Sequence, residues 1–341
     1  MTEDSTIFHE IKQLSLLAHY SKREQIVQGV INSLEKKIIN IGDAMPSVNQ
    51  MINNLGFARQ TIVDAYKELK ESGILESKNR LGYFVISDSS NQPLKVCLII
   101  YAFDTFQETF YENFRKSLGD QVTVDLFFHH NNYDVFQQTV NKVNSKYGVY
   151  VIAPIEGPET AGLLEQLPAK KTLIVDRFVK LNPSYSYIVQ EFSDSSYQAF
   201  VSLLDEIRKF DEFIFFFKHF SAEPNDVLNS FQKFIKDYKI NGTIKNYYEQ
   251  GSIEKHKVYF TIHNLELWEM LKDVKEKNLK LGQDLGILSH NDDNIKEIIF
   301  DGITTFSIDF AEMGKLAAEF VKNRRPIKYI MPTKLFKRNS L

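Results

Sequence analysis

The stretch GDAMPSVNQMINNLGFARQTIVDAYKELKESG, residues 42–73, decides the fold of the N-terminal part of this chain. Ser47 and Gln50 have the spacing of a capping box, which predicts that a helix begins directly after Ser47. Gly56 can adopt a left-handed backbone at low cost and ends that helix. A second helix is predicted immediately afterwards, because apolar residues recur with helical spacing at Ile62, Ala65, Tyr66 and Leu69.

The second helix of this pair is expected to present polar side chains at its N-terminal end, namely Arg59, Gln60 and Thr61. Each of them can reach base edges or phosphates. A short helix, a tight turn and a second helix with hydrogen-bond donors at its start form the layout of a helix-turn-helix. Residues 74–77 and 82–86 then read as two strands with a basic connecting loop, so a β-hairpin wing is predicted.

This segment resembles the GntR family of bacterial regulators. The residues that carry the resemblance are Pro46-Ser47, Arg59, Thr61, Ala65-Tyr66, Leu69, Gly73-Ile74-Leu75 and Gly82-Tyr83-Phe84-Val85. The sequence departs from the family at Asn49, where an arginine is usual, and at Ala58, where Ser or Thr often caps the recognition helix. A missing cap costs about 1 kcal/mol. The resemblance implies a double-stranded DNA operator as a partner, contacted by Ser47, Asn49, Arg59, Gln60, Thr61, Lys78, Arg80 and Gly82.

Whole-chain composition bounds the remaining possibilities. The chain has 341 residues, more than one domain usually needs, and 43% of them are apolar, enough for a sizeable core. The formal net charge is −3, yet residues 19–86 hold nine Lys and Arg against seven Asp and Glu and are mildly basic. Cys97, the single cysteine, lies in an apolar run and is expected to be buried. The sequence shows no signal peptide, membrane span or disulfide framework, so we expect a cytoplasmic protein.

Four regions are predicted along the chain. Residues 1–18 read as an N-terminal arm or short helix, and residues 19–86 as the winged helix-turn-helix domain, whose first helix starts at a second capping box. Residues 87–94 are polar, contain a proline and show no periodicity, which indicates a linker. Residues 95–341 form the remaining, larger part.

From residue 95 onward, short apolar strands alternate with amphipathic helices. This alternation predicts a parallel sheet with helices on both faces. It occurs in two rounds, separated by a long helix expected at 195–210, which indicates two Rossmann-like lobes. The first round is predicted as strands 95–101, 122–128, 148–153, 171–175 and 185–189 with helices 106–118, 133–146 and 160–166. The second round is predicted as strands 212–217, 257–261 and 285–289 with helices 225–238 and 264–277.

This larger part resembles the effector domain of the LacI/GalR family, a relative of periplasmic sugar-binding proteins. The resemblance rests on Leu173-Ile174-Val175-Asp176-Arg177, Leu281-Gly282-Gln283-Asp284-Leu285-Gly286-Ile287, Asn291-Asp292-Asp293, Gly302-Ile303-Thr304-Thr305, Asp309-Phe310, Met313-Gly314, Ala317-Ala318 and Arg338-Asn339-Ser340.

The two resemblances together imply an α/β protein with an N-terminal winged helix-turn-helix and a two-lobe Rossmann-like periplasmic-binding-protein fold. They imply that residues 95–341 bind a small-molecule effector, preferably a monosaccharide, and form a homodimer. The chain is then expected to be a sequence-specific transcriptional regulator, first of all a repressor of sugar-utilisation genes.

Candidate ligand-binding residues follow the C-terminal ends of the predicted strands, which is where open α/β sheets bind ligands. Carboxylate, amide and guanidinium groups bind neighbouring hydroxyls in pairs, and aromatic rings stack on the apolar face of a sugar. Alternatives stay open, because Asp176-Arg177 can be a surface ion pair and residues 291–293 a polar loop. The predicted set is Phe103, Phe106, Asp176, Arg177, His263, Asn264, Asn291, Asp292 and Phe310.

Other kinds of site are disfavoured. His129 and His130 end a predicted strand, where adjacent residues point to opposite faces, so we expect no metal site there. Asp292-Asp293 lacks the spacing of an EF-hand loop. We find no motif of a nucleophile elbow, Walker A loop or dinucleotide site, and we expect no cofactor and no enzyme activity. The remaining alternatives are a regulator that senses a sugar phosphate or a purine, an aminotransferase fused to a reader domain, and a free-standing transport protein.

Overall fold

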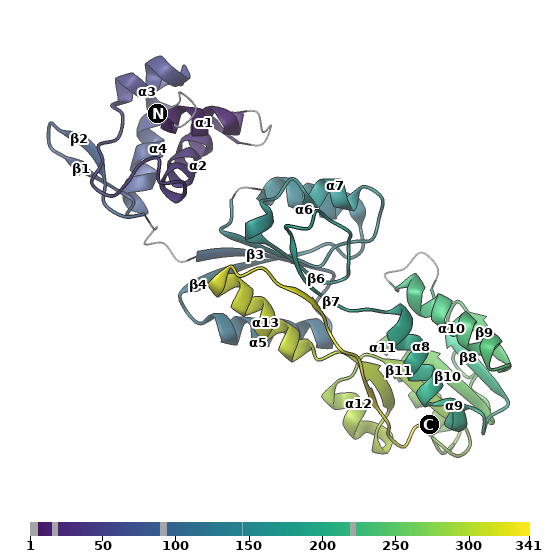
Figure 1. The fold of residues 1–341 in the computed structure, drawn as a ribbon. Helices are drawn as coiled ribbons and strands as arrows, with labels where there is room; N and C mark the ends of the chain where they lie inside the picture. Colours follow the sequence, from purple (N-terminus) through teal and green to yellow (C-terminus); the bar gives the residue numbers. More distant parts are fainter. Residues whose placement is uncertain (1–5, 16–19, 89–93, 145, 219–222) are drawn as a thin grey trace. The chain divides into compact units, whose positions relative to one another are not determined.

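The structure, a computed structural model, describes residues 6–15, 20–88, 94–144, 146–218 and 223–341 (Figure 1). The chain divides into two compact units. The expected boundaries of the arm, the winged domain, the linker and the larger part remain predictions. Residues 89–93 of the expected linker, and 1–5 and 16–18 of the expected arm, lie outside the described residues. The first unit is Met1–Val96 with Asp120–Asp125 and Gln138–Gly148; the second is Cys97–Gly119, Leu126–Gln137 and Val149–Leu341.

The N-terminal domain has the expected winged helix-turn-helix order. Both predicted capping boxes are present, because Ser21 pairs with Glu24 and Ser47 with Gln50. Gly56 ends the first helix of the pair with φ 70°, as predicted. Its elements are α1 Ile7–Ser15, α2 Lys22–Glu35, α3 Val48–Leu55, α4 Arg59–Glu71, β1 Leu75–Lys78 and β2 Gly82–Val85.

One apolar core joins the elements of this domain. Tyr66 of α4 is fully buried and donates a hydrogen bond from its hydroxyl to Pro46 O at 2.6 Å, which fixes α4 against the start of α3. Helix α1 packs on α2, where Gly29 leaves no room for a side chain beside Ile11. The wing strands pair antiparallel from Leu75↔Val85 to Lys78↔Gly82. Strand β1 thus starts one residue later than predicted.

Two six-stranded sheets follow. We call the first sheet with the helices that cover it the N-lobe, and the second sheet with its helices the C-lobe. The N-lobe sheet has the order β13-β7-β6-β5-β3-β4 and the C-lobe sheet the order β14-β12-β11-β10-β8-β9. In the N-lobe β5, β6, β7 and β13 pair parallel, and in the C-lobe β9, β8, β10, β11 and β12 do so, whereas β14 runs antiparallel to β12. The N-lobe strands are β3 Leu94–Ile100, β4 Val122–Phe128, β5 Val149–Ile152, β6 Thr172–Asp176, β7 Ser186–Val189 and β13 Lys328–Ile330. The C-lobe strands are β8 Glu212–Phe216, β9 Gly242–Lys245, β10 Lys257–Thr261, β11 Gly286–His290, β12 Thr304–Ser307 and β14 Lys334–Phe336.

The two sheets follow the same connection pattern, so β6 of the N-lobe corresponds to β11 of the C-lobe. The predicted α/β class with a winged helix-turn-helix and two lobes is confirmed. The N-lobe helices are α5 Thr105–Leu118, α6 Tyr133–Val143, α7 Thr160–Leu164 and α13 Phe310–Asn323. The other helices are α8 Ser193–Ser202, α9 Leu204–Ile207, α10 Asn225–Asp237, α11 Asn264–Glu276 and α12 Asn294–Ile298, with 3-10 turns η1 Ala169–Lys171 and η2 Ile299–Asp301.

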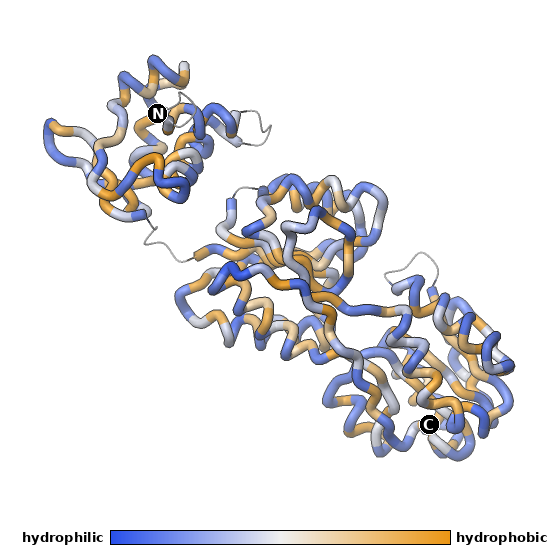
Figure 2. The backbone as a smooth tube through the Cα atoms, viewed as in Figure 1, coloured by the Kyte–Doolittle hydropathy of each residue, from blue (hydrophilic) through white to orange (hydrophobic). Residues whose placement is uncertain are grey.

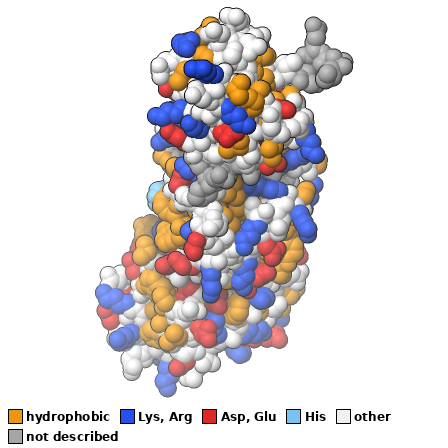
Figure 3. Space-filling model, turned by 90° about the vertical axis from the view of Figure 1, so that its left-hand side faces the viewer, with side chains coloured by type: hydrophobic (Ala, Val, Ile, Leu, Met, Phe, Trp, Pro, Cys, Tyr) orange, Lys and Arg blue, Asp and Glu red, His pale blue; other side chains and the backbone are white. Residues whose placement is uncertain are grey.

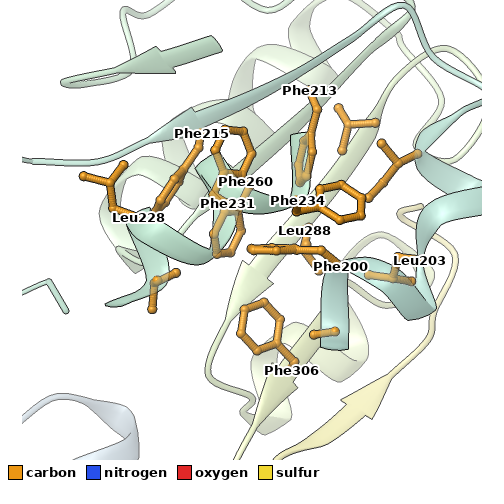
Figure 4. Close-up of a cluster of buried hydrophobic side chains, with 14 of the residues drawn as sticks. Phe200, Leu203, Phe213, Phe215, Leu228, Phe231, Phe234, Phe260, Leu288 and Phe306 are labelled. Atoms are coloured by element: carbon orange, nitrogen blue, oxygen red, sulfur yellow. The ribbon is translucent and has the colours of Figure 1, made fainter. Parts of the chain in front are cut away.

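The strands of both sheets carry the apolar residues, and the outer helix faces carry the polar ones (Figure 2). On one face of the C-lobe sheet the core consists largely of phenylalanines (Figure 4). Phe200 of α8 is its centre, and its ring lies 5.3–6.0 Å from five others. Edge-to-face and tilted ring pairs of this kind add about 0.5–1.5 kcal/mol each beyond their burial. The five partners are Phe213, Phe231, Phe234, Phe260 and Phe306.

Two sequence predictions for the larger part need correction. The long helix expected at 195–210 is two helices, because the backbone leaves the helical region at Leu203 with φ −109° and ψ 11°. Several elements were not predicted: β9, a four-residue edge strand that carries no alternating pattern, and after β11 the elements α12, β12, α13 and β13. Strands 122–128 and 257–261 have the predicted bounds.

Helices α5 and α13 lie side by side on one face of the N-lobe sheet (Figure 1). They approach so closely that a Cβ atom at Gly314 would lie 2.4 Å from Phe110 O of α5. We expect Gly314→Ala to lower the free energy of unfolding by about 1–3 kcal/mol. The steric overlap of the added methyl group with Phe110 O costs more than the better helix propensity of alanine contributes. Chemical denaturation measures the change.

The matched control is Gly162→Ala in α7, where an added Cβ meets no atom within 4 Å. That variant should be neutral or more stable, because only the propensity term remains. Equal stability changes for the two variants would contradict the close approach of α5 and α13.

Candidate functional site

The N-terminal end of α4 presents exposed polar side chains, as the sequence predicted. Arg59 and Gln60 are exposed and Thr61 is half-buried. Arg59 Nη1 donates to Asn49 Oδ1 of α3 at 3.4 Å, so two residues predicted to contact DNA lie together. Ala58 makes no side-chain cap, which leaves the first backbone N–H groups of α4 free of a capping side chain. Ser47 uses its hydroxyl to cap α3.

The wing presents the other predicted DNA-binding residues. Lys78 Nζ lies 3.0 Å from Glu76 Oε1 and 4.8 Å from the ring centre of Phe84. Arg80 is exposed at the tip with φ 62°, and Gly82 follows with φ 100°. In the view of Figure 3, the uppermost part of the surface, which is the N-terminal domain, carries several Lys and Arg side chains with acidic ones among them. This mixture agrees with the small positive charge of residues 19–86.

The carboxyl edge of the N-lobe sheet holds Asp176 and Arg177. Asp176 ends β6 in the left-handed region, with φ 67°, and its carboxylate accepts a hydrogen bond from Gln190 Nε2. Arg177 lies 3.7 Å from Glu156 Oε1, and its guanidinium carbon lies 6.0 Å from the ring centre of Phe192. Arg177 thus forms an ion pair with Glu156, whereas the alternative was an ion pair between Arg177 and Asp176.

Three predicted ligand residues meet around a small cavity in the N-lobe. The rings of Phe106 and Phe310 lie 5.0 Å apart, and Asp176 lines the same cavity. Its volume of about 20 Å³ holds roughly one water molecule. Phe103 lies outside it, is 45% exposed and packs edge-on against Phe128. Phe106 and Phe310 therefore pack against each other, whereas the side chain of Phe103 remains partly exposed to solvent.

The carboxyl edge of the C-lobe sheet is set by strand register. Thr261 of β10 pairs with Phe216 of β8 and Ser289 of β11. Lys218, His263 and Asn291 each come two residues after one of these paired positions, so all three follow the carboxyl edge of the C-lobe sheet. Asn291 is 7% exposed, has φ 61°, and its Oδ1 is buried without a hydrogen-bond partner. His263 is the N-cap of α11, and Asn264 is its first residue.

Asp292 has a different role from its neighbour Asn291. Arg338 Nη1 and Nη2 donate to its two carboxylate oxygens at 2.6 and 2.9 Å, and Thr305 Oγ1 donates at 2.6 Å. Asp293 caps α12. These contacts attach the C-terminal segment to the loop after β11, so the polar-loop alternative describes Asp292 and Asp293 well. A ligand role for Asp292 stays a prediction, and its carboxylate is already occupied.

Sequence reasoning missed two buried basic residues beside this loop. Lys296 is fully buried and donates from Nζ to His290 O at 3.0 Å and Asn291 O at 2.8 Å. Burial lowers the pKa of Lys296 to about 8. His290 lies between the rings of Phe192 and Phe306, and burial lowers its pKa to about 3. His290 directly precedes Asn291 and could have been noticed, but nothing in the sequence marks Lys296.

His129 and His130 lie after β4 rather than on it, so the argument from opposite strand faces was wrong. Both rings lie near Tyr101, with centres 6.1 and 6.3 Å away. His129 Nε2 lies 3.1 Å from Ala153 O, and burial lowers its pKa to about 4. Within the described ranges, no group of three or more His, Cys, Asp or Glu could hold a metal ion. No helix in those ranges is long and apolar enough to cross a membrane.

Comparison with known sequences identifies the N-terminal domain. Residues 22–85 match the family model described as "Bacterial regulatory proteins, gntR family". A 62-residue segment is 31% identical to the HTH-type transcriptional regulator Rv1152 of Mycobacterium tuberculosis, covering 18% of this chain and 51% of the relative. The chain thus spans about half the length of the curated relative that it matches.

Comparison with solved structures identifies the fold of the larger part. The trehalose repressor of Escherichia coli matches with a TM-score of 0.59 and 13% identity, over 72% of this chain and 100% of the repressor. A LacI family regulator of Lactobacillus casei, solved with bound glucose, gives 0.59 and 13% over 72% and 99% of the two chains. A putative transcription regulator from Staphylococcus saprophyticus subsp. saprophyticus gives 0.57 and 16% over 72% and 97%. At these identities the likeness establishes the fold.

The buried histidine predicts an acid limit of stability. Between pH 6.5 and about 3 the unfolded chain binds a proton at His290 that the folded chain does not, so stability falls as the pH decreases through this window. We expect His290→Leu to lose less stability than the parent between pH 7 and 5, by about 2 kcal/mol. Urea denaturation at both pH values measures this.

The control is the exposed His256, where Asn tolerates the left-handed φ of 62°. His256→Asn should follow the pH dependence of the parent. If His290→Leu also follows the parent, His290 is not buried as a neutral group.

Proposed function

We propose that this chain, whose N-terminal domain belongs to the GntR family and whose larger part has the fold of LacI regulators, is a sequence-specific, DNA-binding transcriptional regulator. The observation that carries this proposal is the exposed N-terminal end of α4, where Arg59 and Asn49 lie together beside uncapped backbone N–H groups. Arginine recognises guanine through two hydrogen bonds in the major groove, and the N-terminal end of a recognition helix is placed to reach it. The chain then works in the cytoplasm, on a double-stranded DNA operator.

The effector proposed for the two lobes is a small sugar, and the protein is then a repressor of sugar-utilisation genes. Support comes from the chemistry of the two carboxyl edges, which carry carboxylate, amide, imidazole and guanidinium groups. Two of the fold relatives were solved with glucose and with D-xylulofuranose bound. The cavity beside Asp176 admits about one water, so a sugar would lie at the strand ends and not inside it.

The proposed mechanism is a population shift. A ligand that contacts both carboxyl edges favours the arrangement of the lobes in which it makes most contacts. In a homodimer this arrangement sets the spacing of two winged domains, which match or miss half-sites about one helical turn apart. A sugar phosphate or a purine is the alternative effector, and a fused enzyme is a weaker alternative, because the fold relatives named above are regulators.

The recognition helix is tested with Arg59→Ala. Loss of an arginine that pairs with guanine should weaken specific operator binding by about 1–3 kcal/mol, measured by fluorescence anisotropy. Lys67→Ala is the matched control: Lys67 lies further along α4, is 71% exposed, and its removal also deletes one charge. Unchanged operator binding by folded Arg59→Ala would contradict the proposal.

The wing is tested with Lys78→Ala. This variant should bind all DNA sequences more weakly by the same factor, and the slope of log affinity against log salt concentration should fall by about one.

The effector site is tested with a thermal-shift screen of the full chain against monosaccharides, sugar phosphates and purines. The best ligand is then titrated against Asp176→Asn, because asparagine keeps the left-handed backbone and removes the charge. We expect affinity to fall about tenfold to a hundredfold, as buried ligand hydroxyls lose their partner. Asp205→Asn on the surface of α9 is the control. Unchanged binding by Asp176→Asn would remove this edge from the site.

A further inference from the structure

Two buried carboxylates stand at the carboxyl edge of the C-lobe sheet. Glu223 is 5% exposed and Glu266, in the first turn of α11, is 4% exposed. Each accepts a hydrogen bond from a neighbouring donor: Lys218 N donates to Glu223 Oε2 at 2.6 Å, and Thr261 Oγ1 donates to Glu266 Oε2 at 3.0 Å. These hydrogen bonds fix both side chains beside the ends of β8 and β10.

The cation beside Glu266 balances its charge only partly. Lys218 Nζ lies 3.4 Å from Glu266 Oε1, and its side chain is 44% exposed, so this lysine remains largely in water. On the other side, His263 Nε2 lies 2.7 Å from Glu223 Oε1. A buried carboxylate is costly unless a cation and hydrogen bonds compensate it fully. The Glu266 carboxylate therefore favours a further cation at this edge.

Unused hydrogen-bond acceptors gather at the same edge. Among the described residues, Asn291 Oδ1 is a buried acceptor without a hydrogen-bond partner, and Glu266 Oε1 is a buried acceptor that makes an ion pair with Lys218 Nζ at 3.4 Å but no hydrogen bond. Asn291 directly follows β11, the strand that pairs with β10, and is more than nine-tenths buried. Both atoms need N–H or O–H donors. A ligand that donates hydrogen bonds at this edge would satisfy both atoms.

We infer that the effector carries an ammonium group, as in an amino sugar, and that Glu266 is a specificity-determining residue that binds it. This inference rests on the proposed function of the same site and names the class of its ligand. An ammonium supplies both missing elements, one positive charge and three N–H donors. A hydroxyl supplies a donor but no charge. A phosphate supplies neither and would face the carboxylates of Glu223 and Glu266.

The test compares three forms of one sugar on the full chain: D-glucosamine, D-glucose and N-acetyl-D-glucosamine, with the galactose and mannose series alongside. N-acetylation keeps the ring and removes the charge. In at least one series we expect the amine to bind ten times or more tightly than both neutral forms, by isothermal titration at pH 7. Equal or tighter binding of the neutral sugars overturns the inference and leaves the proposed sugar-responsive function standing. If no sugar of any form binds, both proposals fail.

Variants connect this preference to Glu266. Glu266→Gln keeps the shape of the side chain and should abolish the preference for the amine. Glu269→Gln, on the exposed face of α11, is the matched control and should retain it. Lys218→Met removes the competing cation and should strengthen the preference, and the exposure of Lys218 makes this variant independent of the folding of Glu266→Gln. A preference unchanged in both Glu266→Gln and Lys218→Met overturns the role of this edge.

Discussion

Parallel strand pairing is the constraint on which the candidate site depends. In each lobe the register aligns the carboxyl ends of neighbouring strands, so residues that follow different strands meet at one sheet edge. In the C-lobe, Lys218, His263 and Asn291 are far apart in the sequence and follow the aligned ends of β8, β10 and β11. A slip of one residue in either pairing would turn these side chains to the other face. The phenylalanine core around Phe200 fixes the register, because rings from several strands interlock there (Figure 4).

The corresponding strands β6 and β11 end in the same unusual way. Asp176 and Asn291 both adopt a left-handed backbone, which is uncommon for residues other than glycine but tolerated by Asp and Asn. Such strain persists only where the surroundings enforce it, and it is typical of binding sites. At Asn291 the enforcing contact is the buried ammonium of Lys296, which binds the carbonyls of His290 and Asn291 at the turn. At Asp176 it is Gln190, which also bonds through its backbone to Asp176 O.

The sequence predicted those elements of the fold that are determined by interactions between residues close together in the chain. Capping boxes, helical spacing and apolar runs depend on neighbouring residues, so the helix-turn-helix, the wing strands and many strands of the larger part were found with near-correct bounds. Pairings between distant segments were not visible, such as Arg338 with Asp292 or Lys296 with the carbonyls after β11. The break at Leu203 also escaped, since the apolar pattern continues through it. Asp176, His263 and Asn291 follow their strands as the sequence predicted, and their ligand role stays a prediction; the sequence could not show that Asp292 is paired with Arg338.

Coupling between effector and DNA is the central claim, and thermodynamic linkage offers its most direct test. If a sugar changes operator affinity by some factor, the operator must change sugar affinity by the same factor. The measurement is the affinity of the full chain for its sugar with and without saturating operator duplex, beside the affinity for operator with and without sugar. The account predicts equal factors of about five or more in both directions. Independent binding, with both factors equal to one, would contradict it.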